Sequence, residues 1–264
     1  MTTTAHFGLD PAWTAGTILV LAYAAIMSER VNRALVAGVG ACLVILLGVL
    51  DQDQALAAID LNTIALLLGM MLIVGISRRS GLFQYVAIRS VQLTGGRPAA
   101  TMALLALATA TFSAFLDNVT TVLLVAPVTL ALTAELGVPA FPFLFAQVFA
   151  SNLGGTATLI GDPPNILIGS AANLTFNDFV VNLFPAVVVG VVATGLVGHV
   201  VWGRRLRAEP ERRAAVLARH AHEVITDRVT MWKSLAVLAV VVAAFVFARP
   251  LGLEAGTIAM SGAA

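Results

Sequence analysis

Residues Ser151–Ile166 read SNLGGTATLIGDPPNI, and this stretch decides the fold. Asp162, followed by two prolines, is a strong start for a new helix. We therefore predict a helix that ends near Ser151, a short bare loop, and a second helix over residues 163–172. A broken helix exposes carbonyl groups at one end and amide groups at the other, which together can hold a cation and a polar or anionic solute. Three glycines permit the unwound backbone of the loop: Gly154, Gly155 and Gly161.

Two other interpretations of this stretch fit its residues less well. A phosphate-binding loop would need Gly-Lys-Ser/Thr after the glycines and a strand before them, and the sequence offers neither. Close packing of helices through small residues would explain the glycines but not Asp162 or the double proline. The pattern therefore favours a functional break over a packing motif.

A second interruption lies upstream, in residues 112–121, which read FSAFLDNVTT. Asp117 and Asn118 stand there between two apolar arms, residues 101–116 and 119–132. A carboxylate in the middle of a membrane helix costs about 2.5–3.5 kcal/mol on insertion scales and normally marks function. Asp and Asn also end one helix and cap the next, which suits the tip of a helical hairpin over residues 98–136. The alternative is that either residue is only the N-cap of the second arm, and both roles are compatible.

The composition excludes most soluble classes of protein. Of the 264 residues, 59% are hydrophobic and 11% are charged, and the mean hydropathy is +0.95. Soluble domains carry roughly 25% charged and about 45–50% apolar residues. The chain is therefore predicted to be an all-α polytopic membrane protein and not a soluble catalyst, a nucleic-acid binder or a disulfide-stapled domain. A single cysteine, Cys42, leaves no intrachain disulfide and no cysteine cluster for a metal.

Enzymatic activity inside the membrane is also disfavoured. An intramembrane hydrolase would need a Ser–His pair, paired aspartates or a motif such as H-E-x-x-H in its spans. The sequence shows none of these patterns, so we expect no enzyme. A membrane scaffold without transport would require neither Asp117 nor an unwound loop.

Apolar segments long enough to cross a bilayer organise the rest of the chain. A helix over residues 82–93 mixes apolar and polar residues, and is either interfacial or an ordinary connecting helix. The pattern alone leaves open whether the hairpin re-enters halfway or spans fully. The predicted segments are spans at about 13–27, 34–50, 61–76, 179–202 and 232–248, the hairpin 98–136 and the broken helix 138–172.

Basic residues predict the orientation. Arg and Lys follow the first and third spans and crowd residues 204–233, whereas residues 98–203 contain neither. By the positive-inside rule, the N-terminus lies outside and the basic linker 204–231 is cytoplasmic. The linker is too short and too charged to fold alone. We expect the protein in the cell (inner) membrane, with the lipid bilayer as a partner and no nucleic acid.

Two motifs resemble a known group of transporters. FLDNVTTVLLVAPVTL (Phe115–Leu130) and FASNLGGTATLIGDPPNILIGSAA (Phe149–Ala172) are similar to sequences of the ion transporter superfamily. Most similar are arsenical pump membrane subunits, the P protein and citrate-transporter-like permeases. The resemblance implies inverted repeats, each with a hairpin that re-enters from the cytoplasm and a discontinuous helix, and alternating access.

In that arrangement the chain is one transporter half plus the beginning of the next. Residues 1–203 form the first transmembrane repeat, 204–231 the linker, and 232–264 the start of a second, incomplete repeat. The sequence stops before the second repeat shows its own hairpin and broken helix, so either the chain is truncated or its last helix is unfinished. A complete site should draw on both repeats.

The hairpin tip departs from part of this superfamily. Sodium-coupled dicarboxylate carriers carry Ser-Asn-Thr at the tip, where this sequence has Asp117, Asn118 and Val119. A fixed carboxylate repels a dianionic solute beside it and favours a proton or cation site. This is the pattern that the resemblance associates with the arsenite and sodium–proton branches.

We therefore predict a permease that exports a small inorganic solute, arsenite or a related oxyanion, in exchange for a proton on Asp117. A sodium–proton antiporter is the first alternative, and a di- or tricarboxylate carrier the second. No cofactor beyond a coupling H⁺ or Na⁺ is expected. A second copy of the chain and, for an arsenical pump, a soluble ATPase subunit are the candidate protein partners. The predicted substrate- and ion-binding residues are Asp117, Asn118, Ser151, Asn152, Gly154, Gly155, Thr156, Asp162 and Asn165, with an alternative sodium site at Ser113, Asn118 and Ser151.

Overall fold

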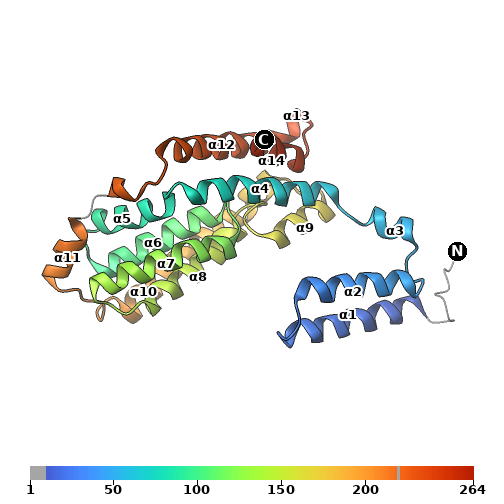
Figure 1. Cartoon of the computed structure of the whole chain (residues 1–264), viewed down its shortest axis with the longest axis horizontal. Helices are drawn as coiled ribbons and strands as arrows, with labels where there is room; N and C mark the ends of the chain where they lie inside the picture. Colours follow the sequence, from blue (N-terminus) through green and yellow to red (C-terminus); the bar gives the residue numbers. More distant parts are fainter. Residues whose placement is uncertain (1–9, 219–220) are drawn as a thin grey trace. The chain divides into compact units, whose positions relative to one another are not determined.

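The computed structural model describes residues 10–218 and 221–264 of the chain. In this part of the chain every regular element is a helix and no strand occurs (Figure 1). The chain divides into two compact units, residues 1–60 and residues 61–264. The apolar, all-helical architecture confirms the predicted class of a polytopic membrane protein.

The first unit contains two apolar helices and a short third one, α1 (Pro11–Met27), α2 (Arg33–Leu46) and α3 (Gln52–Ala57). Neither α1 nor α2 buries a side chain, as expected for helices whose apolar surface faces lipid. The second predicted span, residues 34–50, is shorter as a helix because it ends at Leu46 and Gly48 then turns with φ 70°.

The second unit holds all the later elements, and it is the unit that positions the site. Its helices are α4 (Leu61–Arg79), α5 (Leu82–Leu93), α6 (Pro98–Ser113), α7 (Asn118–Leu136), α8 (Phe141–Thr156), α9 (Pro163–Ala172), α10 (Phe176–Trp202), α11 (Pro210–Leu217), η2 (Ala221–Val224), α12 (Arg228–Val246), α13 (Ala248–Leu251) and α14 (Ala255–Ala263).

Helices α6 and α7 form the predicted hairpin, and α8 lies alongside it (Figure 1). Pro98 begins α6, where its missing N–H is harmless, and Gly137 ends α7 in the left-handed conformation with φ 68°. The turn between the arms covers Ala114–Asp117. The arms have 16 and 19 residues, so they measure about 24 and 28 Å at 1.5 Å per residue.

The discontinuous helix is present, but its break is not where the sequence analysis placed it. Helix α8 continues to Thr156 instead of ending near Ser151, and α9 begins at Pro163. Gly154 and Gly155 are therefore helical residues, and the prediction that they lie in unwound backbone is wrong. The bare loop is confined to residues 157–162.

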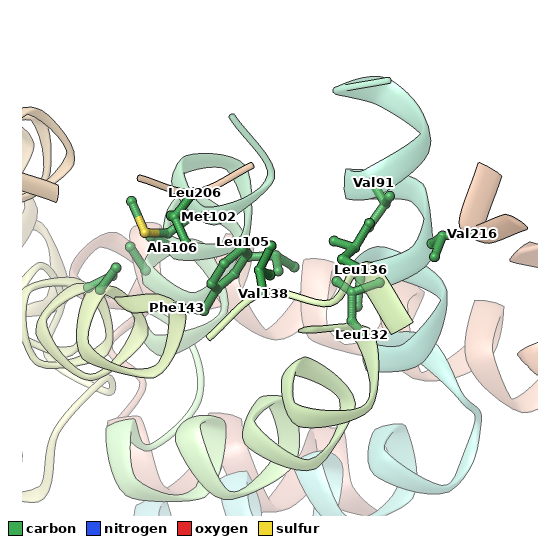
Figure 2. Packing of buried hydrophobic residues seen from close by; sticks show 14 residues of the cluster. Val91, Met102, Leu105, Ala106, Leu132, Leu136, Val138, Phe143, Leu206 and Val216 are labelled. Atoms are coloured by element: carbon green, nitrogen blue, oxygen red, sulfur yellow. The ribbon is translucent and has the colours of Figure 1, made fainter. Parts of the chain in front are cut away.

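A buried apolar cluster holds the base of the hairpin together (Figure 2). Val91 of α5, Leu136 of α7 and Phe143 of α8 are fully buried in it. In a soluble protein, removing one side chain of this size from water contributes roughly 1.5–3 kcal/mol to the free energy of folding. Because Val91 packs against protein, the helix over residues 82–93 has the buried face of a connecting helix.

The basic linker contributes to the same cluster. Leu206 and Val216 are buried there, and the second belongs to α11 (Figure 2). The Arg213 guanidinium donates a hydrogen bond to the Gly95 carbonyl oxygen at 2.7 Å, beside the start of α6. The linker thus contains helical segments that pack against the hairpin base, which its charge pattern did not indicate.

Helix α4 packs against α14 and α12, which also pack against each other. A Cβ atom on Gly69 would lie 2.5 Å from the carbonyl carbon of Ala259, so only glycine permits this approach of the two backbones. Across the same contact the Gly256 amide donates to Asn62 Oδ1 at 2.7 Å.

In the described part of the chain, four helices are long and apolar enough to cross a membrane. They are α4, α7, α10 and α12, whereas α1, α2 and α6 are apolar but shorter. Their exposed surfaces are apolar, as at Val189 and Val200 of α10, which suits contact with lipid.

Candidate functional site

The hairpin tip is built around Asp117, which caps α7. Its Oδ2 accepts hydrogen bonds from the Thr120 amide at 2.8 Å and from the Thr120 hydroxyl at 2.6 Å. The cap interpretation of Asp117 is therefore confirmed. Asp117 is half-buried, and it lines a cavity in addition to capping α7.

Asn118, the next residue, ties the tip to the discontinuous helix. Its side chain is 8% exposed. The amide nitrogen Nδ2 donates to Asn152 Oδ1 at 3.1 Å and to Asp162 Oδ2 at 3.2 Å. One amide thus joins α7, α8 and the break, although 34 and 44 residues of sequence separate the partners.

Hydroxyl groups make a second set of contacts between the same segments. Ser113 Oγ donates to the Ser151 carbonyl oxygen at 2.6 Å, and Thr158 Oγ donates to the Ala114 carbonyl oxygen. Ala114 is the C-cap of α6, where carbonyl groups need partners in a medium without water, whereas Ser151 lies inside α8. These bonds fix the end of α6 against α8 and the break.

Glycines allow the backbones to meet at this junction. A Cβ atom on Gly154 would overlap the backbone of Ala110 in α6. One on Gly155 would lie 2.8 Å from the Gly161 carbonyl oxygen and 3.3 Å from Asn118 Cβ. Gly154 and Gly155 therefore serve close packing, the role that the sequence analysis had considered the weaker one.

Asp162 and Asn165 organise the start of α9. Asp162 occupies the N-cap position, but its side chain makes no capping bond. Pro163 and Pro164 have no N–H, and the Asn165 amide donates to the Asp162 main-chain carbonyl oxygen at 3.0 Å. The Asp162 carboxylate accepts from Asn118 instead. Asn165 Nδ2 donates to the carbonyl oxygens of Gly155 and Thr158, at 3.2 and 2.9 Å, and so closes the open end of α8.

The remaining predicted residues lie along the last turns of α8. Ser151 is buried and its hydroxyl donates to the Val148 carbonyl oxygen at 3.0 Å. Asn152 and Thr156 are exposed, and the Thr156 hydroxyl donates to the Asn152 carbonyl oxygen at 2.8 Å. We call the contact region of the hairpin tip, the end of α8 and the start of α9 the junction; it contains Ser113, Asp117, Asn118, Ser151, Asn152, Gly155, Thr156, Thr158, Gly161, Asp162 and Asn165.

A cavity of about 280 Å³ adjoins the junction. Asp117 and Thr120 line it from the hairpin, Pro163 lines it from α9, and Arg78 lines it from α4. The apolar wall comes from Leu67, Met70, Met71, Val74, Gly75, Ile160 and Ile166. We call this space the tip cavity.

Sequence reasoning missed two polar residues of the tip cavity, Thr120 and Arg78. Thr120 follows Asp117 at the spacing of a helix cap, so the cap pattern could have indicated it. As a basic residue after the third span, Arg78 indicates only orientation. Nothing in the sequence pairs it with a hairpin 39 residues away.

The electrostatics of the junction are dominated by acids. The negative charges of Asp117 and Asp162 repel each other across it. No Lys or Arg occurs in residues 98–203 to offset them. Among the residues that the structure describes, no group of three or more His, Cys, Asp or Glu side chains could hold a metal ion.

Comparison with known proteins identifies relatives that match most of the chain. The family profile described as "Citrate transporter" matches residues 23–264. An uncharacterized transporter of Mycobacterium tuberculosis is 47% identical over 252 residues, which is 94% of this chain and 58% of the relative. A 46 kDa membrane protein of Mycobacterium leprae is 43% identical over the same shares of the two chains. The human P protein is 37% identical over 228 residues, 82% of this chain and 27% of that protein.

The chain spans 58% of the length of the two mycobacterial relatives. The motifs quoted from the hairpin tip and the discontinuous helix both fall inside the matched range.

Proposed function

The chain belongs to the citrate transporter family, whose members are membrane transporters, and from this premise we propose that it is a proton-coupled secondary transporter of a small inorganic solute. Asp117 binds the exchanged proton, and arsenite or a related oxyanion is the exported solute. The protein resides in the cell membrane, with its N-terminus outside and residues 204–231 in the cytoplasm. Two copies of the chain, and for an arsenical pump a soluble ATPase subunit, are its candidate protein partners.

One observation carries this proposal: Asn118 holds Asp162 and Asn152 while its neighbour Asp117 lines the adjoining cavity. The arrangement places two carboxylates beside a cavity at a helix break. Carboxylates in such surroundings are costly in a membrane unless a proton, a cation or a polar partner compensates them. The acids of the junction therefore suit a site that gains and loses a proton during transport.

The depth of the tip supports alternating access. Asp117 shares the tip cavity with Leu67 through Gly75 of α4. With Arg78, the α4 residues of the cavity lie 6 to 17 positions beyond the start of α4 at Leu61, or about 9–26 Å along a helix of about 28 Å. The tip cavity thus runs from the apolar part of α4 to its basic end, and this supports a hairpin that re-enters from the side on which Arg78 lies.

In this proposal the other predicted residues have distinct roles. Asn118, Ser151, Asn152 and Thr156 offer amide and hydroxyl oxygens to the ion or solute, and Asp162 is the second acid. Gly154, Gly155 and Gly161 permit the close packing that brings these groups together, and Asn165 keeps the end of α8 closed.

Two alternatives remain within transport. Sodium would be held by Ser113, Asn118 and Ser151, which gather around Gly155, and the protein would then exchange sodium for protons. A carboxylate carrier is favoured by the family's description. For that solute, charge repulsion by Asp117 and Asp162 would have to be removed first, by a proton or a cation bound at the junction.

Proteoliposomes with a pH-sensitive dye test the proposal. The protein, expressed from its complete reading frame, should move protons when arsenite is added across a pH gradient. Asp117→Asn should lower this flux at least 100-fold, because asparagine still caps a helix but binds no proton. The matched control is Asp227→Asn, which alters a similar cap at the start of α12 and should leave the flux within twofold.

Each other outcome has a definite meaning. If Asp117→Asn leaves pH-driven transport intact, the proton role is wrong. A proton flux on adding sodium, with none on adding arsenite, identifies the antiporter, and a flux only with citrate identifies the carboxylate carrier. If none of the three solutes moves protons, the proposed coupling is wrong.

A further inference from the structure

Two adjacent arginines at the end of α4 have different surroundings. Arg78 lines the tip cavity with Asp117 and Thr120. Arg79 lines another cavity, of about 500 Å³, with Asp227 and Thr230. Consecutive helix positions differ by about 100° in direction, and here Arg78 lines the tip cavity while Arg79 lines the other one.

Arg78 is the cation that lines the tip cavity. Residues 98–203 supply no Lys or Arg, so a positive charge beside the junction has to come from another segment. Among the side chains that the structure describes, Arg78 has no hydrogen-bond or ion-pair partner. Its guanidinium group is therefore available to a solute, for which its planar fork of N–H donors fits carboxylate, phosphate and related oxyanions.

We propose that Arg78 is the anion-recognition residue of the tip cavity, and that among the solutes considered above it selects those that carry a negative charge over uncharged arsenite. The inference rests on the proposed transport function and narrows the solute of the same site. A proton on Asp117 would remove the negative charge that shares the cavity with Arg78. The solute's negative charge then meets a cation and a neutral acid in the same cavity.

The size of the cavity agrees with a small solute. Its volume of about 280 Å³ lies at the lower end of the roughly 300–1,000 Å³ typical of small-molecule sites. The wall is apolar apart from Arg78, Asp117 and Thr120, so these few polar groups determine what is bound.

An ordinary role for Arg78 is to anchor the end of a membrane helix at the interface. Arg79 can fill that role equally, since it follows the same span and is equally exposed. Arg79→Gln is therefore the matched control for Arg78→Gln. A difference between the two variants reports the tip cavity and not the anchoring of α4.

Labelling of a thiol tests the charge of the cavity without knowledge of the solute. Cys42→Ser removes the chain's single cysteine, and Leu67→Cys then places a thiol in the cavity wall, on the same helix as Arg78 but three turns away. The probes are two methanethiosulfonates, the anionic 2-sulfonatoethyl and the cationic 2-trimethylammonioethyl reagents. Arg78→Gln should lower the ratio of anionic to cationic labelling rates roughly fivefold or more, whereas Arg79→Gln should change it less than twofold.

Transport kinetics test solute selection. In proteoliposomes, Arg78→Gln should raise the KM for citrate or inorganic phosphate, whichever is transported, at least tenfold, as expected when a charge-assisted hydrogen bond is lost. Arg78→Lys should restore part of the affinity, because it keeps the charge and loses the fork. Arsenite, which is uncharged near neutral pH, should show no such dependence on Arg78.

The inference is overturned if neither reagent reaches the thiol, if both arginine variants change the labelling ratio equally, or if arsenite is transported and the charged solutes are not. Its failure is separable from that of the proposed function. Asp117→Asn should abolish proton coupling while the labelling ratio still depends on Arg78. The converse, proton coupling through Asp117 with no effect of Arg78, refutes only the inference.

Discussion

Asp117 and Asp227 each precede a helix, and each accepts hydrogen bonds from the amide and hydroxyl of a threonine three residues later. Their surroundings differ. Asp117 is half-buried beside the tip cavity and the junction, whereas Asp227 is exposed at the start of α12. The same cap chemistry therefore serves two situations, and the neighbours supplied by the tertiary fold distinguish a candidate proton site from a structural cap.

The largest loss of stability and transport should come from a substitution that separates the helices around Asp117. Gly154→Ala puts a methyl group into the Ala110 backbone, and overpacking of this kind costs about 1–3 kcal/mol. We expect thermal unfolding in detergent several degrees lower and a strong loss of transport. Gly195→Ala in α10, where nothing lies within 4 Å, should be neutral or stabilising. Equal melting temperatures for the two variants would contradict the close packing at Gly154.

The second largest loss of transport is expected from Asn118→Ala, which should loosen the junction. It removes donors to Asn152 and Asp162, and hydrogen bonds of this kind contribute about 0.5–1.5 kcal/mol each. Asn177→Ala, which removes an exposed bond to the Val246 carbonyl oxygen, is the control. Transport should fall only in the first variant. If the two variants transport equally, the bridge from the tip to the break has no part in function.

Thr120→Val and Thr230→Val compare the two caps directly. Each removes one hydroxyl donor from an aspartate and should cost a similar, small amount of stability. A carboxylate that loses a donor accepts a proton more readily, so only Thr120→Val should move the pH of half-maximal transport upward. The measurement is the pH profile of solute-driven proton flux. A matching shift in Thr230→Val would indicate that the profile does not report Asp117.

The smallest effect concerns Asp227 itself. Hydrogen bonds from the Thr230 hydroxyl and amide, with smaller help from the Val229 amide and the Lys233 charge, hold the pKa of Asp227 below its usual range. Because the folded-state pKa is lowered, the stabilisation is present above the unfolded pKa, about 3.9, and is lost as the pH falls through the lowered value. Asp227→Asn should therefore unfold at slightly lower temperature than the parent at neutral pH. The two should converge in strong acid, and a constant difference at every pH would contradict this origin.

The sequence predicted the two interruptions because each breaks a rule of membrane helices. An acid between apolar arms and an aspartate before two prolines are visible in any window of the chain. The structure places both at helix ends, with Asp117 capping α7 and Pro163 beginning α9.

The role of the glycines could not be read in the same way. Gly154 and Gly155 were assigned to unwound backbone, yet α8 runs through them to Thr156. Glycine is consistent with a turn and with close packing alike, and the choice depends on whether another backbone lies against it. At Gly154 that backbone is Ala110, 44 residues earlier in the chain.

By itself, the sequence determined that this chain is a helical membrane protein with a carboxylate at a hairpin tip and another at a helix break, because composition and local helix signals depend only on neighbouring residues. Only the tertiary structure decided that Asn118, beside the first acid, bonds the second, and that Arg78, not Arg79, lines the cavity at Asp117. Those contacts depend on the rotation and depth of helices far apart in the chain, which close packing sets and local sequence does not encode.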